Sequence, residues 1–384
     1  MQSPVNPERV GKFCSSPEIF VGKGFHLGKD TVPRSNNIET FAVFADALEI
    51  DFENLVFGKD FSDHMFECDF KNGSWQNPII RPYGDLTISP SAKVFHYGQA
   101  VFEGMKAYKD YNDGVFLFRP DQNINRINLS SKRMAIPEFP KDVFLDALHT
   151  LVGIDKDWIQ KGEGNSLYLR PFAIATEVGV SASPSNEYKF MILMAPVQAY
   201  YKGAVKVLIA EKYSRSADGG VGAVKAAGNY GAQFYPTALA QEKGFQQIIW
   251  TDSNEHKYLE EAGTMNVFFR INDTLITAPV SDRILDGVTR KSILEIAKHN
   301  GIQTQVRKLT VDELIEAEKQ GSLKEIFGAG TAAVVSLISH FGYKEQVYEL
   351  PQVEDSYAIS FKKQLMDLQY NKTQDPFGWR VEVK

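Results

Sequence analysis

The chain has 384 residues, of which 43% are hydrophobic and 23% charged, and its formal net charge is −6 at pH 7. This is the balance of an ordinary globular protein with ample apolar material for its cores, and the length predicts two or three domains. Proteins that bind phosphate backbones usually carry a positive excess, so the charge argues against a nucleic-acid partner. No apolar run approaches the roughly 20 residues that span a bilayer, which argues against a membrane protein.

The N-terminal part is weakly patterned and rich in Pro, Gly, Ser and Asn, and we interpret residues 1–45 as an extension. It lacks a secretory signal, so we expect a cytoplasmic location, or a mitochondrial one if the source is eukaryotic. The two cysteines, Cys14 and Cys68, are far apart and indicate free thiols in a reducing compartment. Neither the cysteines nor the histidines have metal-site spacing, so we expect no metal.

The first folded region, residues 46–198, mixes helices with strands and predicts a small α/β domain. Helices are expected from Pro120 and from Pro140, because proline suits the first turn of a helix. Long apolar runs at residues 167–175 and 189–197 are typical of buried strands.

Residues 199–206 are interpreted as a linker, and residues 207–384 as a larger second domain. Apolar runs there predict strands at residues 204–211, 245–252, 266–273 and 274–280. Helical periodicity predicts helices at residues 289–301, 310–317 and 355–370. The first of these helices should stop at Gly301, and the second should be capped by Thr310 with Glu313. Elements mixed in this way in two unequal units predict an α/β (α+β mixed) fold.

Lys225 is the first candidate for chemistry, because it stands in a glycine-rich segment with apolar neighbours, GGVGAVKAAGNYG. Glycines let a backbone approach a ligand closely, and a lysine amine is nucleophilic only when it is neutral. Such a lysine can form a Schiff base with an aldehyde cofactor. The segment alone favours a plainer interpretation, a surface lysine in a flexible loop.

Three later segments change this interpretation. Glu261, interpreted as part of a small-residue turn, could pair with a protonated ring nitrogen. Residues 287–290 open a predicted helix, where free N–H groups and the Thr289 hydroxyl could bind phosphate. Residues 327–333, FGAGTAA, offer a second small-residue turn for an anion. Taken singly, an exposed glutamate and an ordinary helix cap would be the commoner interpretations.

The stretch from Glu261 to Arg290 resembles the signature of the class IV aminotransferases, which are fold-type IV pyridoxal-phosphate enzymes. The matching positions are Glu261, Gly263, Asn266, Val267, Phe268, Leu275, Thr277, Leu285, Gly287, Val288 and Arg290. Within that class the chain resembles the branched-chain amino acid aminotransferases over about residues 50–370, through FGKDFSDHM, HYGQAVFEGMKAY, LFRPDQNINR, SLYLRPF, KAAGNYG, EEAGTMN, LDGVTR and GAGTAA. The resemblance implies a small N-terminal α/β domain and a larger cofactor domain with a pseudo-barrel β core.

The resemblance also implies roles toward pyridoxal 5'-phosphate. Lys225 would bond the cofactor and shuttle a proton, and Tyr230 would contact its phenolic oxygen. Glu261 would pair with the pyridine nitrogen, and Leu285 would pack on the ring. The implied phosphate contacts are Arg126, Val288, Thr289 and Thr331.

On the substrate side, the resemblance implies an aromatic pocket for an aliphatic side chain, with Phe57, Tyr97, Phe102 and Tyr168. Thr331 and Ala332 would hold the α-carboxylate, and Arg170 would meet the side-chain carboxylate of glutamate. Three residues would reach the pocket from a neighbouring subunit, which implies a homodimer: Tyr97, Val178 and Val180. Ala333 and Ser336 replace the redox cysteines of the animal enzymes, so that thiol regulation should be absent.

The implied activity is reversible amino transfer between L-leucine, L-isoleucine or L-valine and 2-oxoglutarate, with ping-pong kinetics. Alternative activities on the same fold are those of a D-amino acid aminotransferase and an aminodeoxychorismate lyase. A non-catalytic cofactor-binding protein is a rival of another class, and joint retention of Lys225, Tyr230, Glu261 and Arg126 argues against it. A structural protein with glycine-rich turns would leave the many spaced matches unexplained.

Overall fold

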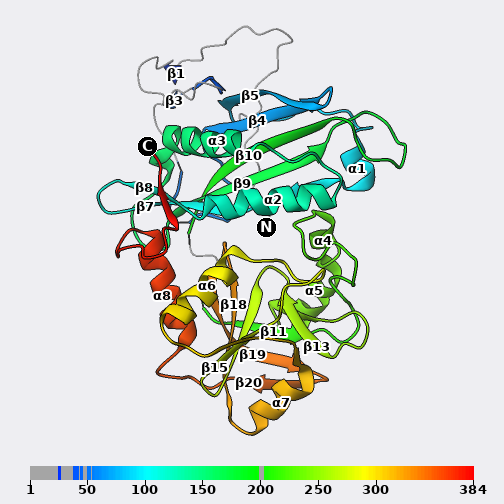
Figure 1. Cartoon of the computed structure of the whole chain (residues 1–384), viewed down its shortest axis with the longest axis vertical. Helices are drawn as coiled ribbons and strands as arrows, with labels where there is room; N and C mark the ends of the chain where they lie inside the picture. Colours follow the sequence, from blue (N-terminus) through cyan, green and yellow to red (C-terminus); the bar gives the residue numbers. More distant parts are fainter. Residues whose placement is uncertain (1–24, 27–37, 43, 46–49, 53, 199–202) are drawn as a thin grey trace.

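The computed structural model describes residues 25–26, 38–42, 44–45, 50–52, 54–198 and 203–384. Most of the predicted N-terminal extension, four residues of the predicted linker and Cys14 lie outside the described residues. The described chain forms two lobes, each built around one large sheet (Figure 1). Apart from these sheets, β1 (Phe25–His26) pairs with β3 (Phe44–Ala45).

The first sheet has the strand order β2-β5-β4-β10-β9-β7-β8-β21, with β6 also paired to β9. Its neighbours are antiparallel, except that β2 and β5 run parallel. The strands are β2 (Glu39–Thr40), β4 (His64–Lys71), β5 (Ser74–Pro82), β6 (Ala100–Phe102), β7 (Met105–Lys109), β8 (Val115–Phe118), β9 (Ser166–Ala175), β10 (Tyr188–Val197) and β21 (Arg380–Glu382).

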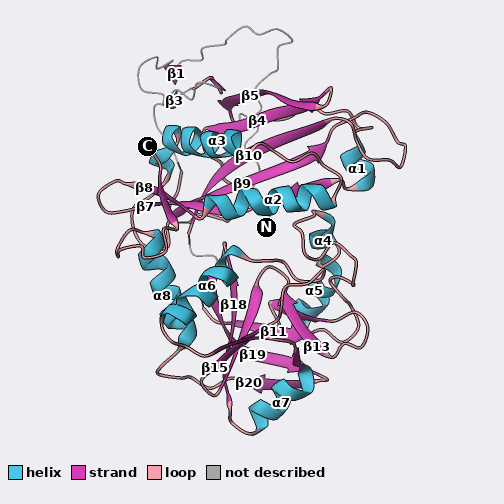
Figure 2. Ribbon diagram, in the orientation of Figure 1, coloured by secondary structure: helices cyan, strands magenta, loops and turns pink. Residues whose placement is uncertain are grey.

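Helices α2 (Pro120–Arg133) and α3 (Lys141–Ile154) pack on this sheet (Figure 2). Helix α3 buries Phe144, Ala147, Leu148 and Leu151, whose spacing places them on one helical face. They join a core in which Phe139 stacks on Phe190 at 3.9 Å between ring centroids. The remaining helices of this lobe are α1 (Lys93–Tyr97) and a short 3₁₀ turn, Lys156–Trp158.

The second sheet has the order β16-β15-β14-β18-β19-β11-β12-β13-β17, with β20 paired to β19, and it curls into a half-barrel. Its strands are β11 (Val205–Ile209), β12 (Gln247–Thr251), β13 (Tyr258–Ala262), β14 (Asn266–Ile271), β15 (Thr274–Thr277), β16 (Thr304–Val306), β17 (Leu309–Thr310), β18 (Leu323–Gly330), β19 (Val334–Tyr343) and β20 (Gln346–Glu349). The helices around it are α4 (Gly228–Gly231), α5 (Phe234–Glu242), α6 (Val288–His299), α7 (Val311–Lys319) and α8 (Tyr357–Gln369). Helices α6 and α8 cover β18 over a core that includes Phe268, Phe327 and Phe361.

The predicted mixed α/β fold is confirmed, and so are most of the predicted elements. Gly301 follows α6 with φ of +69°, the left-handed conformation that glycine adopts at little cost. The Thr310 side chain caps α7 by accepting from the Glu313 N–H at 3.0 Å. Three details were wrong. Pro140 is the residue before α3 rather than its first residue, and Glu261 belongs to β13 rather than to a turn. Phe327–Gly330 belong to β18, so only residues 331–333 of the predicted small-residue turn form a turn.

The lobes meet through backbone contacts near Lys225. Val101 of β6 forms a bridge with Ala226, and the Phe102 N–H donates to the Lys225 carbonyl at 3.1 Å. The end of the chain, red in Figure 1, returns to the first sheet, where β21 pairs with β8. These contacts bring the glycine-rich segment of the second lobe against an edge of the first. Among the described residues, no helix combines the length and apolarity needed to cross a membrane.

Candidate active site

A cavity of about 680 Å³ lies between the two lobes and takes its wall from both. Most of the site residues predicted from the sequence line it: Phe57, Phe102, Arg126, Tyr168, Arg170, Lys225, Tyr230, Glu261, Leu285, Val288, Thr289, Thr331 and Ala332. These residues come from positions up to 275 apart in the chain, since Phe57 and Ala332 both contribute. The fold therefore gathers a set that the sequence presented only as separate segments.

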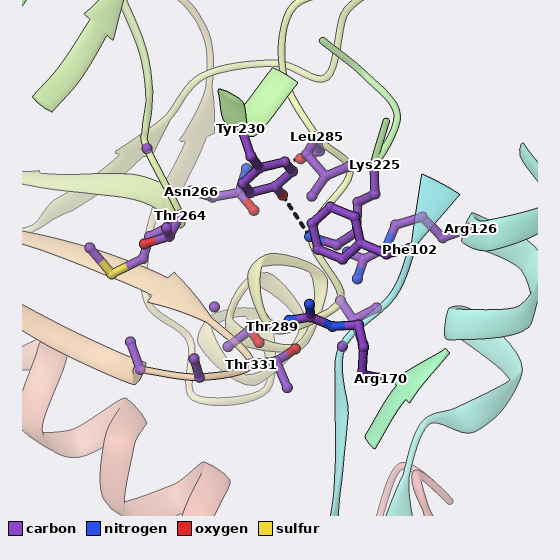
Figure 3. Close-up of a pocket in the computed structure, with 18 of the residues that line it drawn as sticks. Phe102, Arg126, Arg170, Lys225, Tyr230, Thr264, Asn266, Leu285, Thr289 and Thr331 are labelled. Atoms are coloured by element: carbon purple, nitrogen blue, oxygen red, sulfur yellow. Dashed lines mark hydrogen bonds between the residues drawn. The ribbon is translucent and has the colours of Figure 1, made fainter. Parts of the chain in front are cut away.

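Lys225 lies at the centre of this set (Figure 3). Its Nζ donates a hydrogen bond to the Tyr230 hydroxyl at 2.7 Å, the dashed line in Figure 3. The same ammonium lies 4.6 Å from the centroid of the Phe102 ring. Its backbone N–H donates to Ser130 Oγ at 3.0 Å, so the main chain beneath the lysine is held by the first lobe. The amine is therefore aimed into the cavity and has one oriented polar partner there.

One end of the cavity is built to receive an anion. Helix α6 begins at Val288 after Gly287, and no side chain caps its first N–H groups. Val288, Thr289 and Thr331 line the cavity there, together with the guanidinium of Arg126. A helix N-terminus beside a cation and hydroxyls is a phosphate-binding arrangement. Gly287 is required because a Cβ at this position would meet Asn266 Oδ1 at 1.9 Å.

The position of Arg126 is set by Glu103. Arg126 Nε lies 2.6 Å from Glu103 Oε1, and Nη2 lies 2.8 Å from Oε2. The carboxylate also accepts from Asn123 Nδ2 at 2.8 Å and from the Gly104 N–H at 3.1 Å. Burial raises the pKa of Glu103, but Arg126 and these hydrogen bonds outweigh it, and the net pKa lies below the ordinary value. The clamp is therefore a charged pair with both carboxylate oxygens occupied.

The cavity wall also holds the buried carboxylate of Glu261. Its Oε1 lies 2.6 Å from Arg215 Nη1 and accepts from the Leu285 N–H at 3.1 Å. Its Oε2 accepts from Asn266 Nδ2 at 3.2 Å. Burial raises the pKa of Glu261 above its ordinary value, and the Arg215 charge only partly offsets this. A cationic ring nitrogen placed here would favour the ionised carboxylate.

The remaining wall is aromatic with a cation at its edge. Phe57 and Tyr168 meet edge to face at 5.0 Å between ring centroids. Arg170 Nη2 donates to the Tyr168 hydroxyl at 3.0 Å, and its guanidinium lies 4.7 Å from the Phe102 centroid. Gly104 leaves the space that Tyr168 needs, because a Cβ there would meet the Tyr168 hydroxyl at 2.1 Å. Such a wall can pack an aliphatic side chain and can also meet a carboxylate.

Three predicted site residues do not line the cavity of this chain. Tyr97, Val178 and Val180 are exposed by 44%, 65% and 66% on the surface of the first lobe. The Tyr97 hydroxyl donates to the Val180 carbonyl, so the first and last of them are neighbours. Their predicted role, in the cavity of a partner subunit, stays a prediction.

Sequence reasoning assigned no role to Glu103, Arg215 or Asn266. A signal existed for Glu103, because a glutamate between buried strand residues needs a cationic partner. Asn266 was part of the matched signature, yet nothing in the sequence showed that it contacts Glu261. Arg215 gave no signal, since its partner is 46 positions away.

The site therefore combines a lysine amine, an anion-binding end, a buried carboxylate and an apolar wall. It suits a cofactor that carries both a phosphate and a basic ring nitrogen. Among the described residues, no group of three or more His, Cys, Asp or Glu side chains could hold a metal ion.

Comparisons with known proteins agree with this geometry. A family model described as "Amino-transferase class IV" matches residues 100–340. Branched-chain-amino-acid aminotransferase 2 of Bacillus subtilis (strain 168) is 42% identical over 341 residues, which cover 87% of this chain and 93% of that protein. The branched-chain-amino-acid aminotransferase of Mycolicibacterium smegmatis is 38% identical over 363 residues, which cover 92% and 98%.

Solved structures share the fold. The branched-chain aminotransferase of Thermoproteus uzoniensis, solved with norvaline, matches with a TM-score of 0.71 at 20% identity, covering 84% of this chain and all of that one. The branched-chain amino acid aminotransferase of the organism abbreviated T.th., complexed with N-(5'-phosphopyridoxyl)-L-glutamate, matches with a TM-score of 0.67 at 25% identity, covering 83% and 98%. The predicted fold-type IV architecture is thereby confirmed.

Proposed function

We infer the activity from the family, because the chain belongs to the class IV aminotransferases. We propose that it is a branched-chain amino acid transaminase, which moves an amino group reversibly between L-leucine, L-isoleucine or L-valine and 2-oxoglutarate. The observation that carries this proposal is Lys225 Nζ, 2.7 Å from the Tyr230 hydroxyl, in a cavity that is also lined by an anion site and a buried carboxylate. The relatives named as branched-chain aminotransferases support the substrate class.

Pyridoxal 5'-phosphate is the cofactor that fits these residues. Arg126, Thr289, Thr331 and the first N–H groups of α6 would hold its phosphate, and Glu261 would face its ring nitrogen. Leu285 would pack on the ring. When bound, the cofactor supplies an aldehyde that amines can attack and a ring that withdraws electrons from the substrate Cα. The relative solved in complex with a phosphopyridoxyl compound supports this assignment.

The chain's own groups then have distinct tasks. Lys225 Nζ moves a proton at the substrate Cα, since it is the amine in the cavity wall that the Tyr230 hydroxyl orients. Glu261, as a carboxylate, would keep the ring nitrogen protonated. The cavity lies between lobes, so its walls exclude much of the bulk water from the reacting atoms.

One pocket must accept both a branched-chain amino acid and glutamate. We propose that Phe57, Phe102 and Tyr168 pack the aliphatic side chain, and that Arg170 meets the side-chain carboxylate of glutamate. Arg170 suits this task because its Nε is buried without a hydrogen-bond partner among the described residues. The N–H groups of Thr331 and Ala332 would hold the α-carboxylate that both substrates share. The same site thus serves both half-reactions in turn.

We propose that the working unit is a homodimer in which Tyr97, Val178 and Val180 complete the pocket of the partner. Their exposure supports this role, because a cluster of bare apolar side chains is a feature of interfaces. A cytoplasmic location remains part of the proposal. Sedimentation analysis of the cofactor-loaded protein checks the dimer, and a monomer with full activity would contradict it.

The deciding experiment is an absorbance spectrum of the protein loaded with pyridoxal phosphate, before and after addition of L-leucine or D-alanine. We expect the band of the lysine-bound cofactor to disappear with L-leucine and to return with 2-oxoglutarate. A response to D-alanine alone would move the function to the D-amino acid branch of the family. Absence of the band in the wild-type protein would overturn the role of Lys225. Lys243→Ala, at an exposed lysine outside the cavity, is the matched control for Lys225→Ala.

A further inference from the structure

A second cavity, of about 600 Å³, lies against the 331–333 turn. Among the described residues that line it, only Ala332 and Ala333 also line the first cavity. Most of the rest of its wall comes from β7, from β19 and from α8, and the remainder from residues 163–164, 203–204 and 370. It is therefore a separate chamber that shares one turn with the candidate active site.

A buried lysine lines this second cavity. Lys106 is 5% exposed, and its Nζ donates to the Ala332 carbonyl at 3.2 Å. No carboxylate among the described residues forms an ion pair with it. Burial lowers its pKa to about 8, which leaves the ammonium charged at neutral pH. Burying an ammonium there costs free energy unless an anion or a water accepts its remaining hydrogen bonds.

A second buried polar group, the Gln369 amide, also lines the cavity. Gln369 is 6% exposed, and its side-chain oxygen accepts no hydrogen bond within the described part of the chain. Among the described residues, the other charged groups on the wall are Lys362, which is exposed, and Glu163, which Lys372 neutralises at 2.5 Å. The balance of charge inside the cavity is therefore positive. Much of the remaining wall is apolar, including Val334, Leu337, Ile359 and Met366.

We propose that this cavity is a binding site for a small aliphatic carboxylate. The carboxylate would accept hydrogen bonds from Lys106 Nζ, which has donors to spare beyond the one given to Ala332. The hydrocarbon part of the ligand would pack against the apolar side chains of β19 and α8. The Gln369 amide would meet a polar group of the ligand or a water that accompanies it.

The site is positioned to influence the first cavity. A ligand that draws the Lys106 ammonium away from the Ala332 carbonyl releases the turn that contains Thr331 and Ala332. This consequence rests on the proposed function, because that turn is expected to hold the substrate carboxylate. Binding in the second cavity itself does not depend on the proposed function.

The test is equilibrium dialysis of the cofactor-loaded protein against radiolabelled isovalerate, which has no amino or oxo group to react. We expect Lys106→Met to bind one isovalerate fewer per chain than the wild-type protein, through a loss of affinity of at least about 10-fold at this site. Lys362→Met, at the exposed lysine of the same wall, should bind the wild-type number. The neutral isostere isovaleramide should compete at least about 10-fold less well.

Gln369→Leu is the second variant, because it leaves Lys106 and the shared turn intact. We expect it to weaken isovalerate binding while it leaves the KM for L-leucine unchanged, and it decides the question if Lys106→Met fails to load cofactor. An equal number of bound isovalerate molecules in the wild type, Lys106→Met and Gln369→Leu would overturn the proposal. So would equal binding of isovaleramide, because the cavity would then hold apolar molecules or water without selecting an anion.

Discussion

Two buried pairs of glutamate and arginine flank the candidate active site, one in each lobe, and they differ in how completely their polar atoms are satisfied. In the first lobe, Glu103 binds Arg126 through two contacts of 2.6 and 2.8 Å and accepts two further hydrogen bonds. In the second lobe, Glu261 Oε1 meets Arg215 through one contact of 2.6 Å and accepts from the Leu285 N–H at 3.1 Å. Among the described residues, Glu261 Oε2 accepts only from the neutral amide of Asn266, at 3.2 Å.

The pKa values of the two carboxyls move in opposite directions for this reason. Both are buried, and burial alone raises a carboxyl pKa. At Glu103 the charge of Arg126 and the hydrogen bonds outweigh burial, and the pKa falls. At Glu261 burial outweighs Arg215, and the pKa rises. The charge of the Glu103 carboxylate is thus compensated without a ligand, whereas that of Glu261 gains from a cation that enters the cavity.

The chemistry is expected to take place at Lys225, in the cavity that the two pairs flank. Lys225→Ala should lower the transamination rate by at least about 10³-fold, because it removes both the covalent attachment and the proton carrier. The rate with L-leucine and 2-oxoglutarate measures this, with Lys243→Ala as the control. Activity within about 10-fold of the wild type would place the chemistry elsewhere.

The next largest effect is expected for the Glu103–Arg126 pair. Glu103→Gln leaves the buried Arg126 without its counter-charge, so it should cost about 3–5 kcal/mol of folding free energy. Urea unfolding of the cofactor-free protein measures the change. The cofactor should also bind more weakly, because Arg126 loses the partner that orients it. A loss of unfolding free energy below about 1 kcal/mol would show that the Glu103–Arg126 pair does not stabilise the fold.

For the Glu261–Arg215 pair, loss of the carboxylate should lower activity more than stability. Glu261→Gln should lower the rate by about 10²-fold, since a neutral amide cannot keep a ring nitrogen protonated. Its cost to the unfolding free energy should be smaller than that of Glu103→Gln, because the carboxylate it replaces is poorly compensated. The two variants compared in one urea series test this order. Equal losses of stability would remove the distinction between the pairs.

The smallest expected effect is the pH dependence of stability. The folded pKa of Glu103 lies below the ordinary 4.5, so its stabilisation is present above pH 4.5 and is lost as the pH falls through the folded pKa. Glu261 has the opposite sign, because its raised folded pKa makes the ionised form unfavourable above that pKa. Its contribution therefore improves as the pH falls toward 4.5.

Unfolding free energies of the cofactor-free protein between about pH 3 and pH 7, for the wild type and both Gln variants, resolve the two contributions. Each carboxyl changes the slope by at most about 1.4 kcal/mol per pH unit. Relative to the wild type, Glu103→Gln should flatten the loss of stability in acid, and Glu261→Gln should steepen it. Slopes that shift in the same direction would contradict the opposite pKa changes.

Much of the fold and most of the site could be predicted from the sequence. Helix α2 follows from Pro120 and the periodicity after it, and the cap of α7 follows from Thr310. Such signals are local, because a helix cap or an apolar stripe depends on residues within one or two turns. The strands β4 and β5 were not predicted, because both mix polar with apolar residues and their burial depends on packing against α3 and β10.

The sequence by itself predicted which residues carry the chemistry, because Lys225, Tyr230, Glu261 and Thr289 stand in segments that resemble those of the class IV aminotransferases. Tertiary structure alone decided their partners. Glu103 finds Arg126 across 23 positions, and Lys106 finds Ala332 across 226. A buried charge is stabilised by the groups that packing brings within a few ångströms. The spacing of residues in the sequence does not show which groups these are. The cavity between the lobes therefore emerges only when the lobes pack together, whereas each glutamate–arginine pair forms within its own lobe.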